Sequence, residues 1–215
     1  MARQTNGHAA LRERLIDAAE RNIAANGLAG LRARELAGEA GCAVGTIYNV
    51  FEHLDELILS VGSRTLAMLD AALETARLAR PYGSTEDAAD DLVRLALAYL
   101  KFAARHTVRW RALFEHRMSE ARLTPQWFVE QQHQLFAQVE RPLVTLVPDL
   151  DPDARRILAR TLFSAVHGIV ALGLEEKLAS LPFTDLRDQL AATLRAITTG
   201  RAELGSAAHL TRRSS

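Results

Sequence analysis

The sequence predicts an all-α protein, with three short helices at the N-terminus followed by a larger helical domain. Three observations support this prediction. Apolar residues recur at spacings of three and four, which is the periodicity of a helix with one buried face. Almost no stretch alternates apolar and polar residues as a half-buried strand does. Capping residues, prolines and glycines divide the chain into segments of helical length.

The first domain is predicted to span residues 8–52. Its first helix covers about residues 10–25, because Leu11, Leu15, Ala19 and Ile23 share one face. Asn26-Gly27 ends this helix. The second helix covers about residues 32–40 and the third about residues 44–50.

The second domain is predicted to span residues 53–200 and to hold six longer helices, leaving residues 201–215 as a disordered tail. Several helix starts carry capping signals. These are Ser84 with Asp87, Thr124-Pro125, Asp151-Pro152 and Thr184. The six predicted helices cover about 53–78, 84–105, 108–120, a segment from 124, 151–179 and 184–200.

Composition excludes several classes of protein. The formal net charge is zero, so bulk charge does not indicate a polyanionic partner. The single cysteine, Cys42, excludes an intrachain disulfide and a cysteine-based zinc site. The longest uncharged apolar stretch, FSAVHGIVALGL, is shorter than the ~20 residues that span a bilayer. With no signal peptide visible at the N-terminus, we expect a cytoplasmic protein without membrane contact.

The stretch AGCAVGTIYNVF, residues 40–51, has the pattern of a helix-turn-helix. Ala37 is small enough for the two helices to cross closely, and Gly41 can adopt the positive φ that the turn requires. The second helix of the pair would bury three apolar side chains, those of Val44, Ile47 and Val50.

The opposite face of that helix would carry groups suited to a DNA groove. Thr46 and Tyr48 can donate hydrogen bonds to phosphate oxygens, Asn49 can read a base edge, and Gly45 allows close approach of the backbone. From these residues alone, the alternative is a helical corner in a packed bundle, with Tyr48 and Asn49 simply solvated.

Two segments, LIDAAERNIAANG and LRARELAGEAGCAVGTIYNVFEHLDEL, resemble the DNA-binding domain of the TetR family of transcriptional regulators. Residues at the family's motif positions are Leu36-Ala37, Ala40-Gly41, Gly45-Thr46, Ile47-Tyr48 and Phe51. The resemblance implies a ligand-responsive repressor that binds a near-palindromic double-stranded DNA operator and is released by a small-molecule effector. It also implies a homodimer formed through the last two helices. The DNA-contact residues it implies, together with their substitutes, are Arg32, Arg34, Ala43, Val44, Gly45, Thr46, Tyr48, Asn49 and His53.

Several positions depart from the family pattern. Ala43 replaces the serine that caps the recognition helix, and Leu54 replaces a lysine that contacts phosphate, for which His53 could partly substitute. Val50 replaces a histidine. A threonine near the start of the second helix is absent, so Arg32 or Arg34 would take over its phosphate contact.

The net positive charge of the first 51 residues is small, since six arginines against five acids give +1. Weaker or more salt-sensitive DNA binding than that of a strongly basic relative is expected. Arg3 and Arg12 could add contacts from an N-terminal arm or could be solvated surface residues. The alternatives kept open are a helical interaction protein with a degenerate DNA-binding domain and a transcriptional activator.

The region from Tyr99 to Phe136 is rich in aromatic residues with polar groups among them, which is typical of a small-molecule site but also of a core. The candidate ligand-binding residues are Tyr99, Phe102, His106, Trp110, Phe114, Trp127, His133 and His167. The histidines show no metal-ligand spacing, and no nucleophile lies beside a base. We therefore expect no metal, no cofactor and no enzymatic activity.

His167 lies in the apolar segment SAVHGIVALGLEEKL, followed by Gly168 and Gly173. It could be a hydrogen-bonded core histidine, a group at a dimer interface or a ligand anchor. Each glycine within a helix costs ~1 kcal/mol relative to alanine, which close approach of another helix would offset. The segment resembles a TetR branch with a Trp-x-His-Gly-type motif, although the tryptophan is missing here.

The last two predicted helices each have an apolar face, formed by Ile157, Phe163, Ile169 and Leu172 and by Leu186, Leu190, Leu194 and Ile197. The faces could meet their copies in a dimer, as the resemblance implies, or be buried within one chain.

Overall fold

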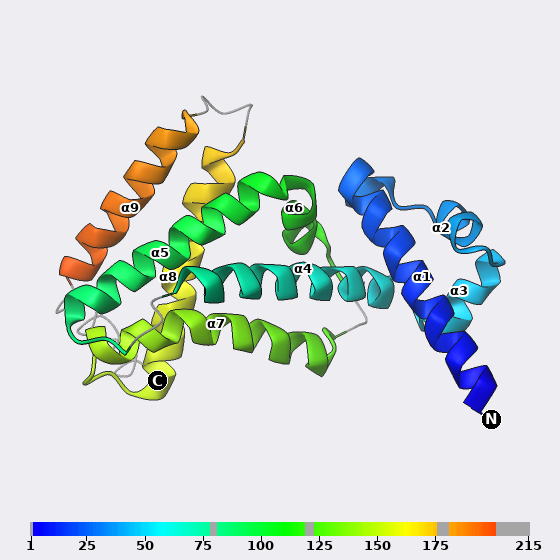
Figure 1. The fold of residues 1–215 in the computed structure, drawn as a ribbon, viewed down its shortest axis with the longest axis horizontal. Helices are drawn as coiled ribbons and strands as arrows, with labels where there is room; N and C mark the ends of the chain where they lie inside the picture. The colour runs from blue at the N-terminus through cyan, green and yellow to red at the C-terminus, as the bar shows by residue number, and fades with distance from the viewer. Residues whose placement is uncertain (1, 78–80, 119–122, 176–180, 201–215) are drawn as a thin grey trace. The chain divides into compact units, whose positions relative to one another are not determined.

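A computed structural model describes residues 2–77, 81–118, 123–175 and 181–200, with side chains from Gly7 onward. Every regular element in these ranges is helical, which confirms the predicted all-α class (Figure 1). The elements are α1 (Ala2–Asn26), the 3₁₀ helix η1 (Leu28–Gly30), α2 (Ala33–Ala40), α3 (Val44–Val50), α4 (Leu54–Ala76), α5 (Thr85–Arg105), α6 (Thr107–Glu115), α7 (Gln126–Leu146), α8 (Pro152–Gly173) and α9 (Phe183–Thr199).

The helices form two compact units. The first contains residues 1–68 and 106–131, and the second contains residues 69–105 and those from 132 onward. The helix α4 therefore contributes its first part to one unit and its last part to the other. The predicted functional domains, residues 8–52 and 53–200, divide the chain differently and stay a prediction.

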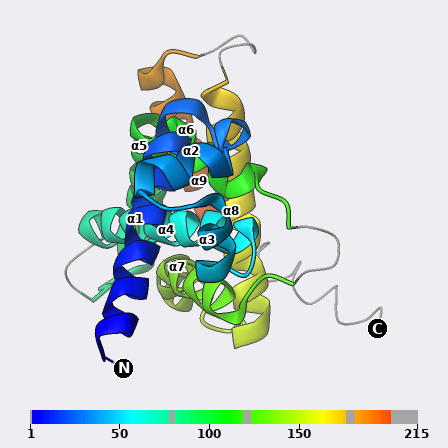
Figure 2. The ribbon, with the colours of Figure 1, turned by 90° about the vertical axis from the view of Figure 1, so that its right-hand side faces the viewer.

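The core of the first unit forms where α1, α2 and α3 meet (Figures 1 and 2). Leu15, Ile23, Leu36, Ile47 and Phe51 are fully buried there. The apolar face predicted for the first helix is therefore its buried face, and burial of these side chains stabilises the unit.

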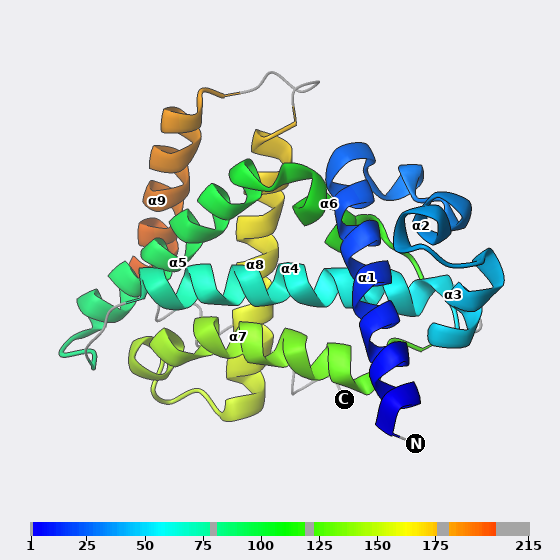
Figure 3. The ribbon, with the colours of Figure 1, turned by 45° about the vertical axis from the view of Figure 1, so that its right-hand side comes forward.

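The core of the second unit contains apolar side chains of α5, α7 and α8, and α9 packs along α5 and α8 (Figure 3). Among the described residues, α8 is the one helix long and apolar enough to cross a membrane by length and composition. Only 22% of its apolar window is buried within this chain.

Two predicted caps are present in the structure. The Ser84 hydroxyl accepts a hydrogen bond from the Asp87 N–H at 3.1 Å, and the Asp87 carboxylate accepts one from Gly83 N–H at 2.9 Å. One carboxylate oxygen of Asp151 accepts bonds from the N–H groups of Asp153 and Ala154, each at 3.0 Å. These bonds satisfy amides that have no partner within the helix.

Four predicted boundaries are wrong. The helix α1 starts at Ala2 and not near residue 10. The helix α6 ends at Glu115 and not near residue 120. The helix α8 ends at Gly173 and not at residue 179. A β-carbon at Gly173 would lie 2.5 Å from a methyl group of Leu186, so α9 approaches α8 closely at this end. Thr184 lies inside α9 and does not cap it; the helix starts after Pro182, whose ring fixes φ near the helical value. The predicted tail, residues 201–215, lies outside the described residues.

Gly41 is the position where the turn requires glycine. We expect Gly41→Ala to lower the free energy of unfolding by about 1–2 kcal/mol, because its φ of 69° is left-handed and costs an L-residue that amount. The matched control is Gly38→Ala in α2, because Gly38 is exposed and a β-carbon placed there would have no heavy atom within 4 Å. That change should raise stability by up to about 1 kcal/mol. Urea unfolding measures both, and a loss of equal size in the two variants would contradict the conformational explanation.

Candidate functional site

The turn between α2 and α3 is built by backbone geometry. Gly41 ends α2 with φ 69° and ψ 41°, and the Cys42 N–H donates to the Ala37 carbonyl oxygen at 2.9 Å. The chain then extends through Ala43, whose side chain makes no cap bond, and α3 begins at Val44. The structure thus contains the predicted helix-turn-helix.

The helix α3 buries Ile47 completely and leaves its opposite face in solvent. Tyr48 is 52% exposed, and Asn49 and Gly45 are also exposed. The prediction that Val44 is buried is wrong: its side chain is 39% exposed, because Val44 occupies the first turn, ahead of the residues that contact the core. Val44 therefore adds apolar surface to the exposed face, where a thymine methyl group could contact it.

Most arginines near this face are engaged within the protein. The Arg32 guanidinium donates to the carbonyl oxygens of Ala29 and Leu31 at 2.6 and 3.1 Å. Arg14 donates to the Ala40 carbonyl oxygen, and Arg21 pairs with Glu39 at 2.6 Å.

Arg34 differs from these arginines. It is exposed on α2 and makes no hydrogen bond or ion pair with any residue that the structure describes. Of the two arginines proposed to replace the missing threonine, Arg34 is therefore the one available to a phosphate. The side chain of Arg3 lies outside the described part of the chain.

Arg12 is neither a solvated arginine nor a member of a free arm. Its guanidinium lies over the Phe51 ring, 4.9 Å from the centroid, and donates to the Ser60 hydroxyl at 3.1 Å and to Glu56 at 3.4 Å. The contact ties α1 to the end of the helix-turn-helix and to the start of α4. Of the remaining predicted positions, His53 lies near Glu52, 3.6 Å from its carboxylate, and Thr46 is half-buried.

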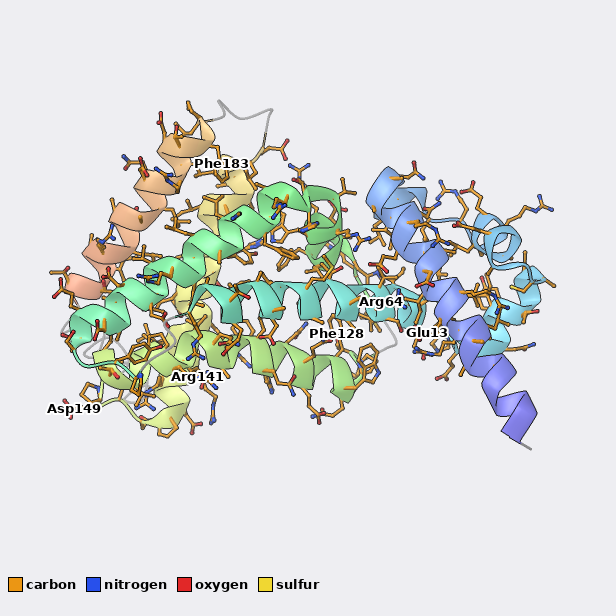
Figure 4. The ribbon with its side chains drawn as sticks, viewed as in Figure 1. Glu13, Arg64, Phe128, Arg141, Asp149 and Phe183 are labelled. Carbon is orange, nitrogen blue, oxygen red and sulfur yellow. The ribbon has the colours of Figure 1, made fainter. Side chains whose placement is uncertain are left out.

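An ion cluster behind the helix-turn-helix was missed by the sequence reasoning. The Arg64 guanidinium on α4 contacts three carboxylates of α1, at 2.7 Å from Glu13, 2.6 Å from Asp17 and 2.7 Å from Glu20 (Figure 4). Arg109 on α6 reaches Glu20 at 2.5 Å. Burial alone would lower the pKa of Arg64, but the hydrogen bonds that its guanidinium donates to Asp17, Glu20 and Glu13 outweigh it and raise that pKa. The spacing of the three acids along one face of α1 is the signal that could have indicated a cation on a neighbouring helix.

The second unit holds an apolar cavity among α4, α5, α7, α8 and α9. It contains about 560 Å³ of atom-free space, part of it open to solvent. The side chains that line it are Leu69, Leu73, Leu92, Leu95, Ala96, Tyr99, Leu135, Phe136, Val139, Leu162, Phe163, Val166 and Leu194. Its almost wholly apolar lining is typical of small-molecule sites.

A hydrogen-bonded pair lies at the wall of this cavity. The Tyr99 hydroxyl and His167 Nδ1 are 2.8 Å apart, and the His167 ring stacks on Phe163 at 5.9 Å between centroids. Burial lowers the pKa of His167, so the imidazole is neutral near pH 7. His167 is half-buried and hydrogen-bonded within its own chain, and its roles as a ligand anchor or as a group at a dimer interface stay predictions.

The other candidate ligand residues are distributed over both units. Phe102 is buried on α5, and His133 lies 3.2 Å from Arg160. The first unit holds His106 at the start of α6, Trp110, which is 2% exposed and pairs with Phe114, and Trp127, which pairs with Phe128. The structure therefore brings Tyr99 and His167 together at the cavity, and a ligand-binding role for all eight candidates stays a prediction.

A helix-turn-helix with an exposed polar face, joined in one chain to a helical unit with an apolar cavity, defines a DNA-binding regulatory protein. Residues 15–61 match the family model for bacterial regulatory proteins of the tetR family, and residues 92–211 match that for the tetracycline repressor-like C-terminal domain. The chain therefore belongs to the TetR family of transcriptional regulators. Comparison with curated proteins gives no match.

Solved structures share the fold. A protein of unknown function from Rhodococcus sp. RHA1 is 24% identical, with a TM-score of 0.65 over 86% of this chain and 93% of that chain. A putative TetR-family regulator from Vibrio parahaemolyticus is 24% identical, with a TM-score of 0.56 over 86% and 97%. RolR in complex with resorcinol is 15% identical, with a TM-score of 0.64 over 94% and 96%.

Proposed function

We propose that the protein is a cytoplasmic repressor that binds a near-palindromic operator as a homodimer and is released by a small molecule. The observation that carries the proposal is the exposed face of α3, with Tyr48 and Asn49 opposite the fully buried Ile47. Membership in a family of transcriptional regulators favours this role over a catalytic one.

In the proposed complex, the two α3 helices of a dimer enter successive major grooves about 34–36 Å apart. Tyr48 and Arg34 contact phosphates and Asn49 contacts a base edge. Because most of the arginines are engaged internally, few counterions are released on binding. Weak binding with a shallow salt dependence follows, rather than the greater salt sensitivity expected from charge alone.

The outer face of α8 supports a dimer. Ile157 is 65% exposed and Leu172 is 62% exposed, and no heavy atom lies within 4 Å of a β-carbon placed at Gly168 between them. The close approach of another helix expected at the two glycines is met at Gly173 by Leu186 of the same chain, whereas nothing described in the chain approaches Gly168. A second copy of the protein is therefore the simplest partner for this face of α8. By contrast, Leu186, Leu190 and Leu194 of α9 are buried within their own chain, so α9 would contribute its small exposed residues, such as Ala192 and Ala196.

The cavity supports control by a ligand. A protein of the same fold, RolR, has been solved with resorcinol bound. A ligand that favours a conformation with the wrong spacing of the two α3 helices would weaken DNA binding, and DNA would weaken ligand binding by the same factor.

Binding to DNA upstream of the protein's own gene tests the proposal, measured by fluorescence anisotropy against random DNA of equal length. We expect Tyr48→Ala to weaken binding to both DNAs by about tenfold, because a lost phosphate contact carries no sequence information. Asn49→Ala should weaken operator binding by ~1–3 kcal/mol and change random-DNA binding little, because it removes a base contact.

Both side chains are exposed, so neither change should alter the unfolding midpoint. Equal losses on operator and random DNA for Asn49→Ala would contradict its base-reading role. If a genome-wide selection found no bound DNA, the helical interaction protein would be the better description, and an operator whose occupancy increases transcription would make the protein an activator.

A further inference from the structure

We propose that the cavity of the second unit binds an uncharged, mostly hydrocarbon molecule with at most one hydrogen-bonding group, which lies at Tyr99. This inference rests on the proposed ligand-responsive function for its biological meaning, but it concerns the chemistry of the cavity and can be tested without DNA.

The lining is the first argument. Of the thirteen side chains that line the cavity, twelve are hydrocarbon, and Tyr99 has the one polar side-chain atom. The lining comes from five helices, so a bound molecule would be surrounded by apolar groups rather than lying on one helix face. Such a wall favours hydrocarbon at about 25 cal/mol for each Å² removed from water.

The absence of a counter-charge among these lining residues is the second argument. An isolated ion loses far more hydration free energy on burial than hydrocarbon contacts can return. His167 could in principle offer a positive charge to a carboxylate, but burial lowers the pKa of this imidazole and keeps it neutral near pH 7. The Arg160 guanidinium lies over the ring of Phe136 at 5.6 Å, but Arg160 is exposed and does not line the cavity.

The Tyr99–His167 pair is the third argument, because it places a neutral polar group at one point of an otherwise apolar wall. A hydroxyl can both donate and accept hydrogen bonds. An alcohol or carbonyl oxygen at that point would keep a hydrogen-bonding neighbour, whereas elsewhere in the cavity it would face only carbon.

The first experiment measures ligand class on the intact, unmodified protein. The neutral fluorophore N-phenyl-1-naphthylamine serves as the probe, and octan-1-ol, octanoate and octylammonium compete with it at pH 7. We expect octan-1-ol to displace the probe at least ~100-fold more effectively than either ion, because each ion must be buried without a partner. Displacement by octanoate or octylammonium as effective as that by octan-1-ol would overturn the proposal, as would failure of the probe to bind.

Two substitutions then locate the binding. Ala96→Leu adds volume inside the cavity and should weaken probe binding by about tenfold or more. Ala71→Leu adds the same volume at an exposed position of α4 and should leave it unchanged. Circular dichroism shows whether both variants are folded. Equal effects of the two changes would place the probe elsewhere and overturn the assignment.

Tyr99→Phe tests whether the Tyr99 hydroxyl forms a hydrogen bond with the bound molecule. It should reduce displacement by octan-1-ol about fivefold to tenfold, the size of one neutral hydrogen bond, while displacement by propylbenzene stays the same. If Tyr99 had a purely structural role, the substitution would weaken displacement of the probe by octan-1-ol and by propylbenzene equally. Anisotropy on operator DNA with the same preparation separates the two proposals, because DNA binding without probe binding refutes only the ligand class.

Discussion

Replacing Ile157 and Leu172 together by glutamate is expected to convert the proposed dimer into monomers and to reduce operator affinity at least ~100-fold. Both side chains are largely exposed in the single chain, so the change leaves the interior of the protomer untouched. In a dimer packed through α8, each chain would instead bury two carboxylates against apolar surface without a cationic partner, which costs several kcal/mol for each ion. Monomers would then bind one half-site at a time and lose the gain from two linked contacts.

Sedimentation equilibrium measures the mass, and anisotropy measures DNA binding. The matched control places two glutamates at Ala71 and Thr75, which are exposed on α4, so that the net charge changes equally. This control should remain a dimer. A double variant at Ile157 and Leu172 that stays dimeric would show that α8 is not the interface.

The second large effect is expected from Arg64→Met, which should lower the free energy of unfolding by about 2 kcal/mol. Arg64 contacts Glu13, Asp17 and Glu20, and its removal leaves these three carboxylates close together, with Arg109 still paired to the largely buried Glu20. Methionine keeps the hydrocarbon part of the side chain, so the change reports chiefly on charge. The expected cost lies between that of an exposed ion pair and that of a buried one.

Arg21→Met is the matched control, since Arg21 contacts Glu39 at 2.6 Å, a distance similar to those in the Arg64 cluster. Both partners of that pair are exposed, so the expected loss is at most about 0.5 kcal/mol. Urea unfolding of the two variants gives the comparison directly. If both substitutions cost the same, the Arg64 cluster would stabilise the unit no more than a surface ion pair does.

The helix-turn-helix could be predicted from the sequence because it depends on local properties. The turn needs a residue with positive φ, and Gly41 provides it. The bounds of α3, Val44–Val50, were predicted correctly from periodicity. Val44 shows the limit of this reasoning. Periodicity places it on the same face as Ile47, but the core reached by α3 does not extend to its first turn.

The ligand site shows a stronger limit. Aromatic residues close in sequence, such as Trp110 and Tyr99, suggested one pocket, yet they belong to the interiors of different units. An aromatic side chain looks the same in a sequence whether it packs in a core or lines a cavity, because only its neighbours in space distinguish the two.

The sequence by itself determined the helical class, the turn at Gly41, the caps at Ser84 and Asp151, and the family, because each depends on residues within one or two turns of one another. Only the tertiary structure decided that Arg12 and Arg64 bind within the protein, that α9 buries its leucines in its own chain, and that Tyr99 meets His167. Those outcomes depend on contacts between residues far apart in the sequence, 68 positions for Tyr99 and His167, where the packing of whole helices, and not local preference, sets which side chains meet.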